Sequence, residues 1–487
     1  MHLSINRQVR YGLRAPERSL GTVLLGIFAA LQWFSLGRDL LVNLLGDWVT
    51  GIAGVLNASS VFVLVAGTIW FARKYGFRIR GLSKVWWFLV AGLVAVNTLR
   101  GFWQGLVVYF VIYDLLSFTV ILCFVVIGSI PEAFEQVRRI WFWVLFAAIL
   151  VNILAMADIS GMFQDVSTGV RIARETVSYR TQNSLDVVIL CAAFAFEYPL
   201  WKRLVVASGL ALVMLQQLLF QKRLEVAFYL ILLVLISWIW LGAKGVLRQK
   251  LRNQIVILGA MIFALLFAAG LVKSNLIIPQ AEALWNRITG QADTNQYSTS
   301  FVSYALYDNE RFKMVRESLA LLEPWELMWG RGMGGGVELH EYNPRVLDSS
   351  DRDRFLASYY LEDYGFFGRR GFEVGMATPV LKGGFIFFLV YYLGFAVVIT
   401  HAAVVRQTFV GRIALGLVVA LWAYTLLGGD FALSCVFQMT IAGACLGCCL
   451  AAVSRGQRAA DGTALLRGAA PARQSLLRAP RPAPGSL

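Results

Sequence analysis

The series of long apolar runs constrains the fold of this chain more than any other feature of its sequence. Hydrophobic residues make up 58% of the 487 residues and charged residues only 15%, against about 45–50% and about 25% in soluble domains. Runs of about 18 or more apolar residues can cross a hydrocarbon core about 30 Å thick as helices, which satisfy their own backbone hydrogen bonds. The sequence therefore predicts an all-α polytopic membrane protein with about twelve transmembrane helices. The expected spans lie near residues 20–36, 55–72, 85–99, 105–130, 140–157, 184–200, 204–220, 224–242, 254–272, 383–404, 411–428 and 431–453.

The distribution of Lys and Arg predicts how these helices cross the membrane. Cytoplasmic connections carry an excess of cations, and the richer set of connections is the one that includes the N-terminus. We therefore expect both termini in the cytoplasm and the long central segment outside. The net charge of +15 follows mostly from this bias, so it does not indicate a nucleic-acid partner. The cation-rich connections are 1–18, 73–84, 131–139, 199–203, 243–252, 405–412 and 455–487.

This orientation divides the chain into membrane and soluble parts. The tail is rich in Ala, Arg, Gly and Pro and cannot bury enough apolar surface to fold alone. The expected parts are a cytoplasmic N-terminus at 1–18, transmembrane helices 1–9 at 19–272, a large periplasmic loop with short amphipathic helices at 273–382, transmembrane helices 10–12 at 383–453, and a disordered cytoplasmic tail at 454–487.

Neither a metal site nor a cofactor site is expected. The cysteines lie in apolar runs and behave there as small buried hydrophobic residues. Cys445 and Cys448 have the spacing of a zinc or redox motif, but they lack a polar setting and partner histidines. Asp351 and Asp353 spell a DxD pattern, which can hold a metal in some enzymes, but a charged surface run is the simpler explanation.

Of the basic residues that lie outside the central loop on the predicted outer face, three are candidates for anion binding: Arg180, Lys222 and Arg223. Arg180 and Arg223 each precede an inward-running helix, whose N-terminus adds unpaired N–H groups and a positive dipole end. Guanidinium groups suit bidentate binding of phosphate. The pattern predicts an anion site, although Lys222 and Arg223 could instead mark the membrane interface and extend their charges into water.

The central loop contributes a further arginine at the start of an amphipathic pattern. Arg311 precedes four apolar residues at helical spacing, and the helix they predict should lie on the membrane surface or across the mouth of the bundle. Arg311 could then face substrate, or it could belong to a solvated polar face. The apolar positions are Phe312, Val315, Leu319 and Leu322.

The same loop carries the residues best suited to proton transfer. His340 is the histidine on the predicted outer side, and a histidine of near-neutral pKa can take a proton from a substrate hydroxyl. Glu338 or Glu341 could act as the base or orient His340, whereas a loop histidine can also be merely solvated. The preceding run at 332–336 could offer backbone N–H groups to phosphate as a nest, or form a simple flexible turn.

Three carboxylates lie in or at the ends of apolar runs: Asp114, Asp186 and Asp430. A charge at the centre of a spanning helix costs about 2.5–3.5 kcal/mol on insertion scales. These residues are therefore candidates for pairing between helices, and they keep a transporter or flippase as an alternative function.

Taken in order along the chain, these features resemble the O-antigen polymerase and O-antigen ligase superfamily, integral membrane glycosyltransferases of the GT-C type. Gln221-Lys222-Arg223 before an apolar run resembles the Ser-Arg element of the family. The stretch 311–334 is similar to its "Arg, helix, Gly-x-Gly" segment, and 377–385 resembles the entry to the span after the large loop. Together with the topology, the resemblance covers residues from about 170 to 400.

The resemblance implies transfer of a glycan from an undecaprenyl diphosphate carrier to a glycan acceptor, at the periplasmic face of the bacterial inner membrane. Neither a nucleotide sugar nor a metal is implied, and a chain-length regulator is a candidate partner besides the lipid bilayer. Arg223 matches an arginine that contacts the carrier diphosphate, whereas Arg180 and Arg311 match by location. His340 and Glu338 are the candidate catalytic residues.

Two positions depart from the ligase pattern of the family. That pattern has Asn, Ser or Gln after the histidine, and a glycine ten residues further on. Here Glu341 follows His340, and Asp351 stands at the glycine position. The departure favours a polymerase of O-antigen or exopolysaccharide repeat units, with a ligase to lipid A core or protein as the alternative.

Overall fold

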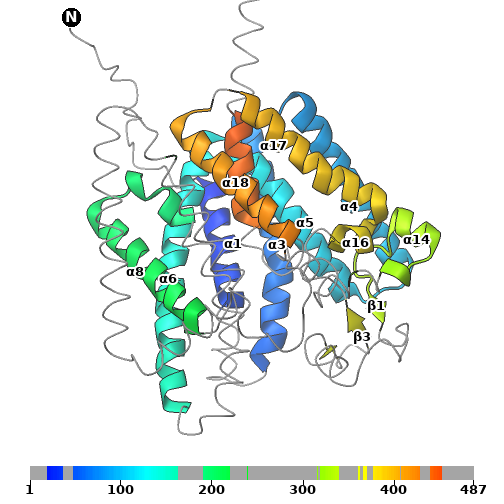
Figure 1. The fold of residues 1–487 in the computed structure, drawn as a ribbon, viewed down its shortest axis with the longest axis horizontal. Coiled ribbons are helices and arrows are strands. Elements are labelled where there is room, and N and C mark those ends of the chain that lie inside the picture. The colour runs from blue at the N-terminus through cyan, green and yellow to red at the C-terminus, as the bar shows by residue number, and fades with distance from the viewer. Residues whose placement is uncertain are drawn as a thin grey trace, which may run out of the picture.

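The computed structural model describes residues 19–36, 48–162, 190–219, 239, 315, 319–338, 360–361, 366–369, 377–405, 407–427 and 439–451. These residues are mainly helical, as the sequence predicted, and include one small sheet that was not expected (Figure 1). The labelled helices are α1 Leu20–Leu36, α3 Trp48–Tyr75, α4 Gly81–Trp103, α5 Val108–Gly128, α6 Pro131–Met162, η2 Ala195–Glu197, α8 Leu200–Leu219, α14 Pro324–Trp329, α16 Ala377–Phe388, η7 Leu389–Leu393, α17 Gly394–Val404 and α18 Phe409–Leu427. The strands are β1 Val337–Glu338, β2 Tyr360–Leu361 and β3 Phe366–Arg369.

The apolar helices give the described part of the chain the character of a membrane protein. Among the described residues, three helical segments are long and apolar enough to cross a membrane: Gly81–Trp103, Phe110–Gly128 and Ala377–Val404. Shorter apolar helices cover Leu20–Gln32, Phe409–Ala423 and Met439–Ala451. The total of about twelve spans stays a prediction, because the spans expected near 224–242 and 254–272 lie outside the described residues apart from position 239.

One expected span ends earlier than predicted. The sequence predicted a helix over 184–200, but helical turns at 190–193 give way to the 3-10 turn η2, and α8 begins at Leu200. Tyr198 is extended, with φ −84° and ψ 147°, because it precedes Pro199 and a residue before proline is pushed out of the helical region. The proline therefore lies between two segments that the sequence had also separated, and α8 begins a few residues before the span expected over 204–220.

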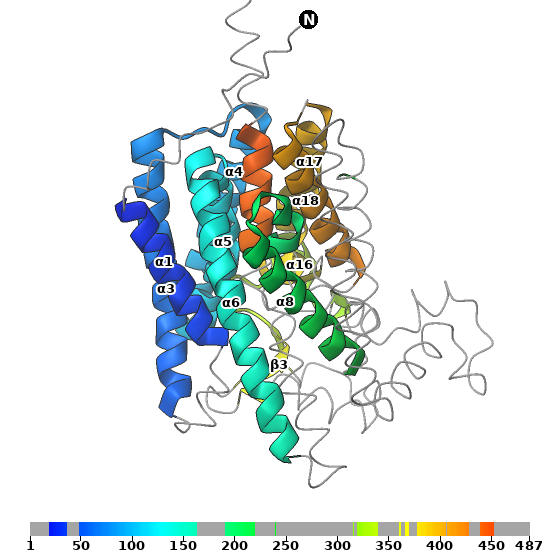
Figure 2. The ribbon, with the colours of Figure 1, turned by 90° about the vertical axis from the view of Figure 1, so that its left-hand side faces the viewer.

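Helix α5 lies inside the helical body, among α3, α4 and α6 (Figures 1 and 2). Most of its side chains are buried, although the segment Phe110–Gly128 is apolar enough to cross a membrane. A helix that is hydrophobic all round is suited to this central position. Because α5 is covered on most sides, a charge on it must find its partner within the protein.

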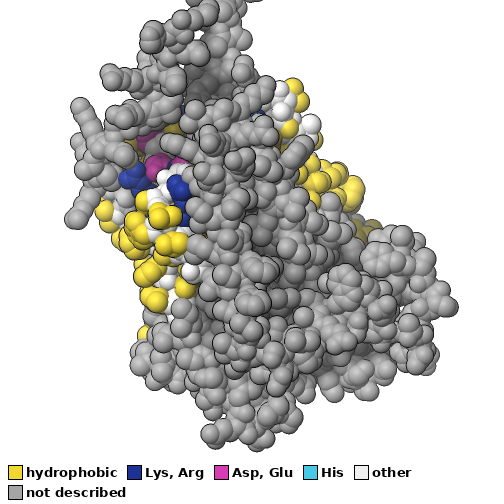
Figure 3. Space-filling view, turned by 60° about the vertical axis from the view of Figure 1, so that its left-hand side comes forward, with side chains coloured by type: hydrophobic (Ala, Val, Ile, Leu, Met, Phe, Trp, Pro, Cys, Tyr) yellow, Lys and Arg dark blue, Asp and Glu magenta, His cyan; other side chains and the backbone are white. Residues whose placement is uncertain are grey.

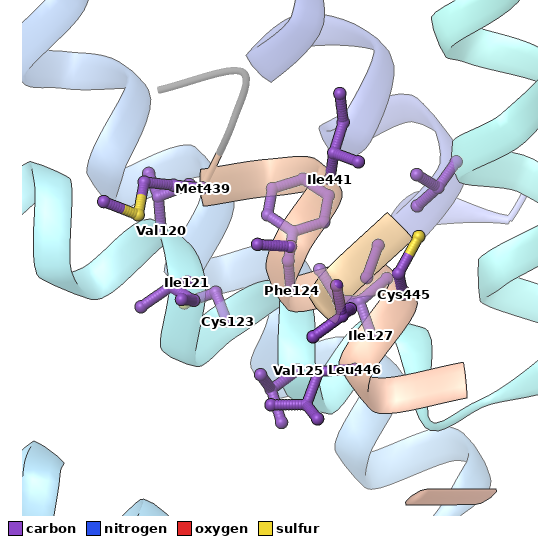
Figure 4. Close-up of a cluster of buried hydrophobic side chains, with 14 of the residues drawn as sticks. Val120, Ile121, Cys123, Phe124, Val125, Ile127, Met439, Ile441, Cys445 and Leu446 are labelled. Carbon is purple, nitrogen blue, oxygen red and sulfur yellow. The ribbon is translucent and has the colours of Figure 1, made fainter. Parts of the chain in front are cut away.

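The unlabelled helix at 439–451 packs against α5 with almost no space between the two backbones (Figure 4). A Cβ atom added to Gly447 would lie 2.3 Å from the carbonyl oxygen of Val125, and one added to Gly128 would lie 2.1 Å from that of Ala444. Small residues allow this close approach of helices in membranes. Gly128 and Gly447 are therefore contact points between the two helices.

At one end of the helical body, segments from three parts of the chain meet. Arg138 of α6 is buried and forms ion pairs with Glu135 and Glu197. Burial lowers the pKa of the Arg138 guanidinium, but the two carboxylates outweigh burial and raise this pKa above its ordinary value. The ring of Phe196 lies 5.0 Å from that of Phe409, so the segment before α18 joins this end.

Charged and apolar side chains also lie close together on part of the molecular surface. On the face seen in Figure 3, basic and acidic side chains lie together above a larger group of hydrophobic side chains. On α6 and α8, Trp143 and Trp201 are exposed, and the ammonium of Lys202 lies 5.4 Å from the ring centre of Trp201. Exposed indoles beside a lysine are typical of a membrane–water interface. The assignment of this end to the cytoplasm stays a prediction.

The π-helical turn η7 fixes α16 and α17 against their neighbours. The indole N–H of Trp86 in α4 donates to the carbonyl of Val390 at 2.9 Å. On the other side, the hydroxyl of Tyr392 donates to the carbonyl of Trp422 in α18 at 3.3 Å. These bonds hold η7, and with it the end of α16, against α4 and α18.

Candidate functional site

The glycine segment, defined here as Gly330–Gly336, is seated between α4, α5 and α16 at the end of the helical body opposite Arg138. Residues 332–336 are buried, although they belong to the large polar loop. The N–H of Arg331 donates to the carbonyl of Leu381 at 2.8 Å, and the N–H of Gly332 donates to that of Lys382 at 3.0 Å. The loop is therefore joined to the first turns of α16 by main-chain bonds.

The next amides of the glycine segment also have partners within the protein. Met333 N–H donates to the carbonyl of Asn97 in α4 at 3.0 Å, and Gly335 N–H donates to the carbonyl of Gly332 at 3.1 Å. The sequence suggested either a phosphate nest or a flexible turn at this position. The segment forms a turn, but its backbone is buried and the N–H groups of Gly332 to Gly335 are bonded within the protein, so these groups do not form a nest for phosphate.

A buried ion pair lies at the centre of the glycine segment. Lys382 Nζ of α16 lies 2.6 Å from Asp114 Oδ2 of α5, and both side chains are 0% exposed. Gly334 N–H donates to the same carboxylate oxygen at 2.7 Å, and Lys382 Nζ donates to the carbonyl of Gly335 at 2.5 Å. Charges taken out of water need both a counter-charge and hydrogen bonds. The Asp114–Lys382 pair has both, so it links two membrane helices and the loop.

The pairing of Asp114 with another helix was predicted from its place in an apolar run, and this prediction is confirmed. Asp186 and Asp430 lie outside the described residues. The position of Lys382 was not anticipated, because the sequence placed it at the end of the loop and started the tenth span at 383. Helix α16 instead begins at Ala377, with Pro379 in the first turn, where proline is tolerated, and carries Lys382 shortly before a kink at Gly384.

Two glycines permit the close approach of the loop to α16. Gly330 and Gly384 have φ of 71° and 69°, in the left-handed region that favours glycine. A Cβ at Gly330 would lie 2.4 Å from the nitrogen of Gly383, and a Cβ at Gly384 would lie 2.1 Å from the carbonyl oxygen of Met328. Larger residues at either position would push α14 away from α16.

A second group of polar contacts fixes α14 just before the glycine segment. Arg331 Nε lies 3.1 Å from Glu326 Oε1, and Arg331 Nη1 donates to the carbonyl of Gly336 at 2.8 Å. Arg100 of α4 donates to the carbonyl of Trp329 at 2.8 Å, and its guanidinium lies 4.7 Å from the ring centre of Trp325. These arginines therefore hold the loop in place.

Of the candidate catalytic residues, Glu338 lies in the part of the chain that the structure describes, and its backbone pairing is known. Glu338 ends strand β1 and lies opposite Gly368 in the antiparallel pairing with β3. Val337, which follows the glycine segment directly, is fully buried. The packing of the glycine segment therefore fixes the position of Val337 and Glu338, which precede His340 in the sequence.

The other predicted site residues lie outside the described residues: His340, Arg180, Lys222, Arg223 and Arg311. The structure therefore neither gathers nor separates them. Of the amphipathic helix predicted after Arg311, Val315 is helical and buried, Leu319 is helical and half-buried, and Leu322 is buried.

No group of three or more His, Cys, Asp or Glu side chains that could hold a metal ion occurs among the described residues. Comparison with known proteins adds no assignment: no family model matches the chain, and no curated protein and no solved structure matches it significantly. The function therefore has to be argued from the sequence and from the seated glycine segment.

Proposed function

We propose that this protein is a glycosyltransferase of the bacterial inner membrane, which polymerises glycan repeat units carried on undecaprenyl diphosphate at the periplasmic face. The observation that carries the proposal is the seating of the glycine segment by the Asp114–Lys382 pair. Long loops with an ordered structure are usually functional. A loop held by a buried ion pair has a fixed position in the molecule, which a catalytic loop requires.

The packing of the glycine segment limits the region that the proposed base can occupy. A chain advances at most about 3.3–3.6 Å per residue, so the Cα atom of His340 lies within about 7 Å of that of Glu338. Glu338 follows the buried Val337 at the end of the helical body. A base in this region would be close to the membrane surface, where the diphosphate of a lipid carrier must lie.

In the proposed reaction, His340 or Glu338 takes the proton of an acceptor sugar hydroxyl. The hydroxyl oxygen attacks the anomeric carbon of the donor glycan, and the bond from that carbon to the diphosphate oxygen breaks. Undecaprenyl diphosphate leaves with the bonding electron pair. Cations at Arg180, Lys222, Arg223 and Arg311 would stabilise this leaving group, since electrostatic stabilisation of developing charge is often the largest catalytic contribution. The reaction as written needs no cofactor.

The proposal is tested by complementation of a strain that lacks the gene. Arg223→Ala should abolish the ladder of polymer lengths on a gel, because it removes a guanidinium from the leaving diphosphate, and Arg223→Lys should restore part of the ladder. His340→Ala and Glu338→Gln should show which of the two residues is the base, because loss of the base should weaken the ladder more than loss of its neighbour. A normal ladder with Arg223→Ala would contradict the proposed role of Arg223.

The same strain distinguishes a polymerase from a ligase. Loss of a polymerase leaves single repeat units on their acceptor, whereas loss of a ligase leaves long chains that are attached only to the carrier lipid. We expect single repeats, because the residues after His340 depart from the ligase pattern.

A transporter or flippase is the second candidate, and the Asp114–Lys382 pair itself is the observation that favours it. Ionisable residues buried among membrane helices often mark ion or proton pathways. A transporter that moves protons through this pair would lose activity when the pair is made neutral by Asp114→Asn with Lys382→Gln. A glycosyltransferase in which the pair only seats the loop would retain most of its activity.

A further inference from the structure

Helix α14 presents an apolar surface although it belongs to the large polar loop. Its sequence is Pro-Trp-Glu-Leu-Met-Trp, and four of these side chains are exposed hydrophobic groups. Exposed large apolar patches on a protein mark sites of interaction with proteins, ligands or membranes. The exposed fractions are 46% for Trp325, 37% for Leu327, 46% for Met328 and 53% for Trp329.

Polar groups on and beside α14 have partners within the protein. Glu326 is mostly covered by its ion pair with Arg331, with 13% of its side chain exposed. The carbonyl of Trp329 accepts a hydrogen bond from Arg100, and the indole N–H of Trp325 donates to the carboxylate of Glu323. A segment that enters lipid must satisfy its polar groups within the protein, and α14 meets this requirement at these positions.

The apolar surface of α14 continues onto helices that are long and apolar enough to span a membrane. Trp103 at the end of α4 is 92% exposed, and Phe385 of α16 is also exposed. Arg100 of α4 lies against Trp325, and Gly384 of α16 lies against Met328, so these helices border α14 directly (Figure 1). One surface therefore runs from the outward faces of α4 and α16 onto the loop helix.

We propose that α14 is immersed in the bilayer, with its apolar side chains against lipid acyl chains and its tryptophans at the boundary with the headgroups. Lipid is the occupant that this surface fits, because it is continuous with the outward faces of two spanning helices. Indoles are enriched at the membrane–water interface, and tryptophans stand at both α14 and the end of α4. This segment of the loop predicted at 273–382 is thus a membrane segment.

Spin labelling in proteoliposomes tests this proposal. Single cysteines are placed at Leu327 and Met328 in a protein whose native cysteines are replaced, and each label is probed by collision with oxygen and with a water-soluble nickel chelate. Val96→Cys, on the exposed apolar face of α4, serves as the lipid reference. We expect oxygen accessibility to exceed nickel accessibility severalfold at both test positions, as at the reference.

Two outcomes would overturn the proposal. Higher accessibility to nickel would place α14 in water, and low accessibility to both reagents would show that another segment or a second copy of the chain covers it. A second measurement needs no cysteine replacement: lipids brominated on their acyl chains should quench less fluorescence in Trp325→Phe/Trp329→Phe than in the wild type. Equal quenched intensity in the two proteins would contradict immersion.

Discussion

The Asp114–Lys382 pair makes a double-mutant cycle the sharpest test of how the loop is held. Both side chains are 0% exposed, and Nζ lies 2.6 Å from Oδ2. Asp114→Asn leaves a buried ammonium without its counter-charge, and Lys382→Gln leaves a buried carboxylate. Breaking a buried pair from one side costs about 3–5 kcal/mol, so each single variant should lose about that much free energy of unfolding.

The double variant should be much closer to the wild type than the single variants suggest. Asn at 114 keeps an oxygen that can accept the N–H of Gly334, and Gln at 382 keeps an N–H that can donate to the carbonyl of Gly335. Neutral replacement of both partners is often nearly without cost. We therefore expect a loss of about 1 kcal/mol and a favourable coupling energy above about 2 kcal/mol.

The free energy of unfolding can be measured in mixed micelles by titration with SDS, with the intrinsic fluorescence of the 15 tryptophans as the readout. Lys84→Gln is the matched control, because Lys84 is an exposed lysine of α4 and surface substitutions usually change stability by at most about 0.5 kcal/mol. If the two single losses simply add in the double variant, with a coupling energy below about 0.5 kcal/mol, the pair does not hold the loop.

Three further substitutions test the packing. Gly447→Leu should lower the free energy of unfolding by about 1–3 kcal/mol or more, since a Cβ there meets the backbone of α5; an unchanged SDS titration midpoint would contradict this contact. Gly384→Ala should lower the free energy of unfolding by at least about 1–2 kcal/mol because of its positive φ, and it should speed proteolysis at α14. Cleavage at the wild-type rate would contradict the close contact of α14 with α16. Arg138→Met should cost about 1.5–3 kcal/mol because it deprives Glu135 and Glu197 of their partner, and equal stability of Arg138→Met and Arg138→Lys would count against that role.

The sequence predicted the spanning helices where hydropathy alone decides, as for α4 and α5. It was less exact at the ends of segments, because Pro199 ends one segment and α8 begins directly after it, a few residues before the span expected from 204. It failed for the glycine segment, whose conformation depends on contacts with α4, α5 and α16. Short-range pattern reading cannot supply such long-range contacts, although the lone charges Asp114 and Lys382 near apolar runs were a usable signal.

The candidate site divides in the same way. Asp114 could be predicted to pair with another helix because an isolated charge is costly in lipid, but its partner could not be chosen from spacing. Two arginines near α14 show the opposite problem, because they are charged residues with a structural role. Arg331 and Arg100 stabilise the loop, so a cation on the predicted outer side is not by that fact a ligand for phosphate.

The central claim is that the protein forms glycosidic bonds from a lipid-linked donor, and turnover by the purified protein tests it most directly. The protein is reconstituted in liposomes that contain the repeat unit on undecaprenyl diphosphate. We predict release of undecaprenyl diphosphate in proportion to the new linkages, with longer glycans on the remaining carrier. Movement of the unchanged repeat unit across the bilayer, without release of undecaprenyl diphosphate, would contradict the claim.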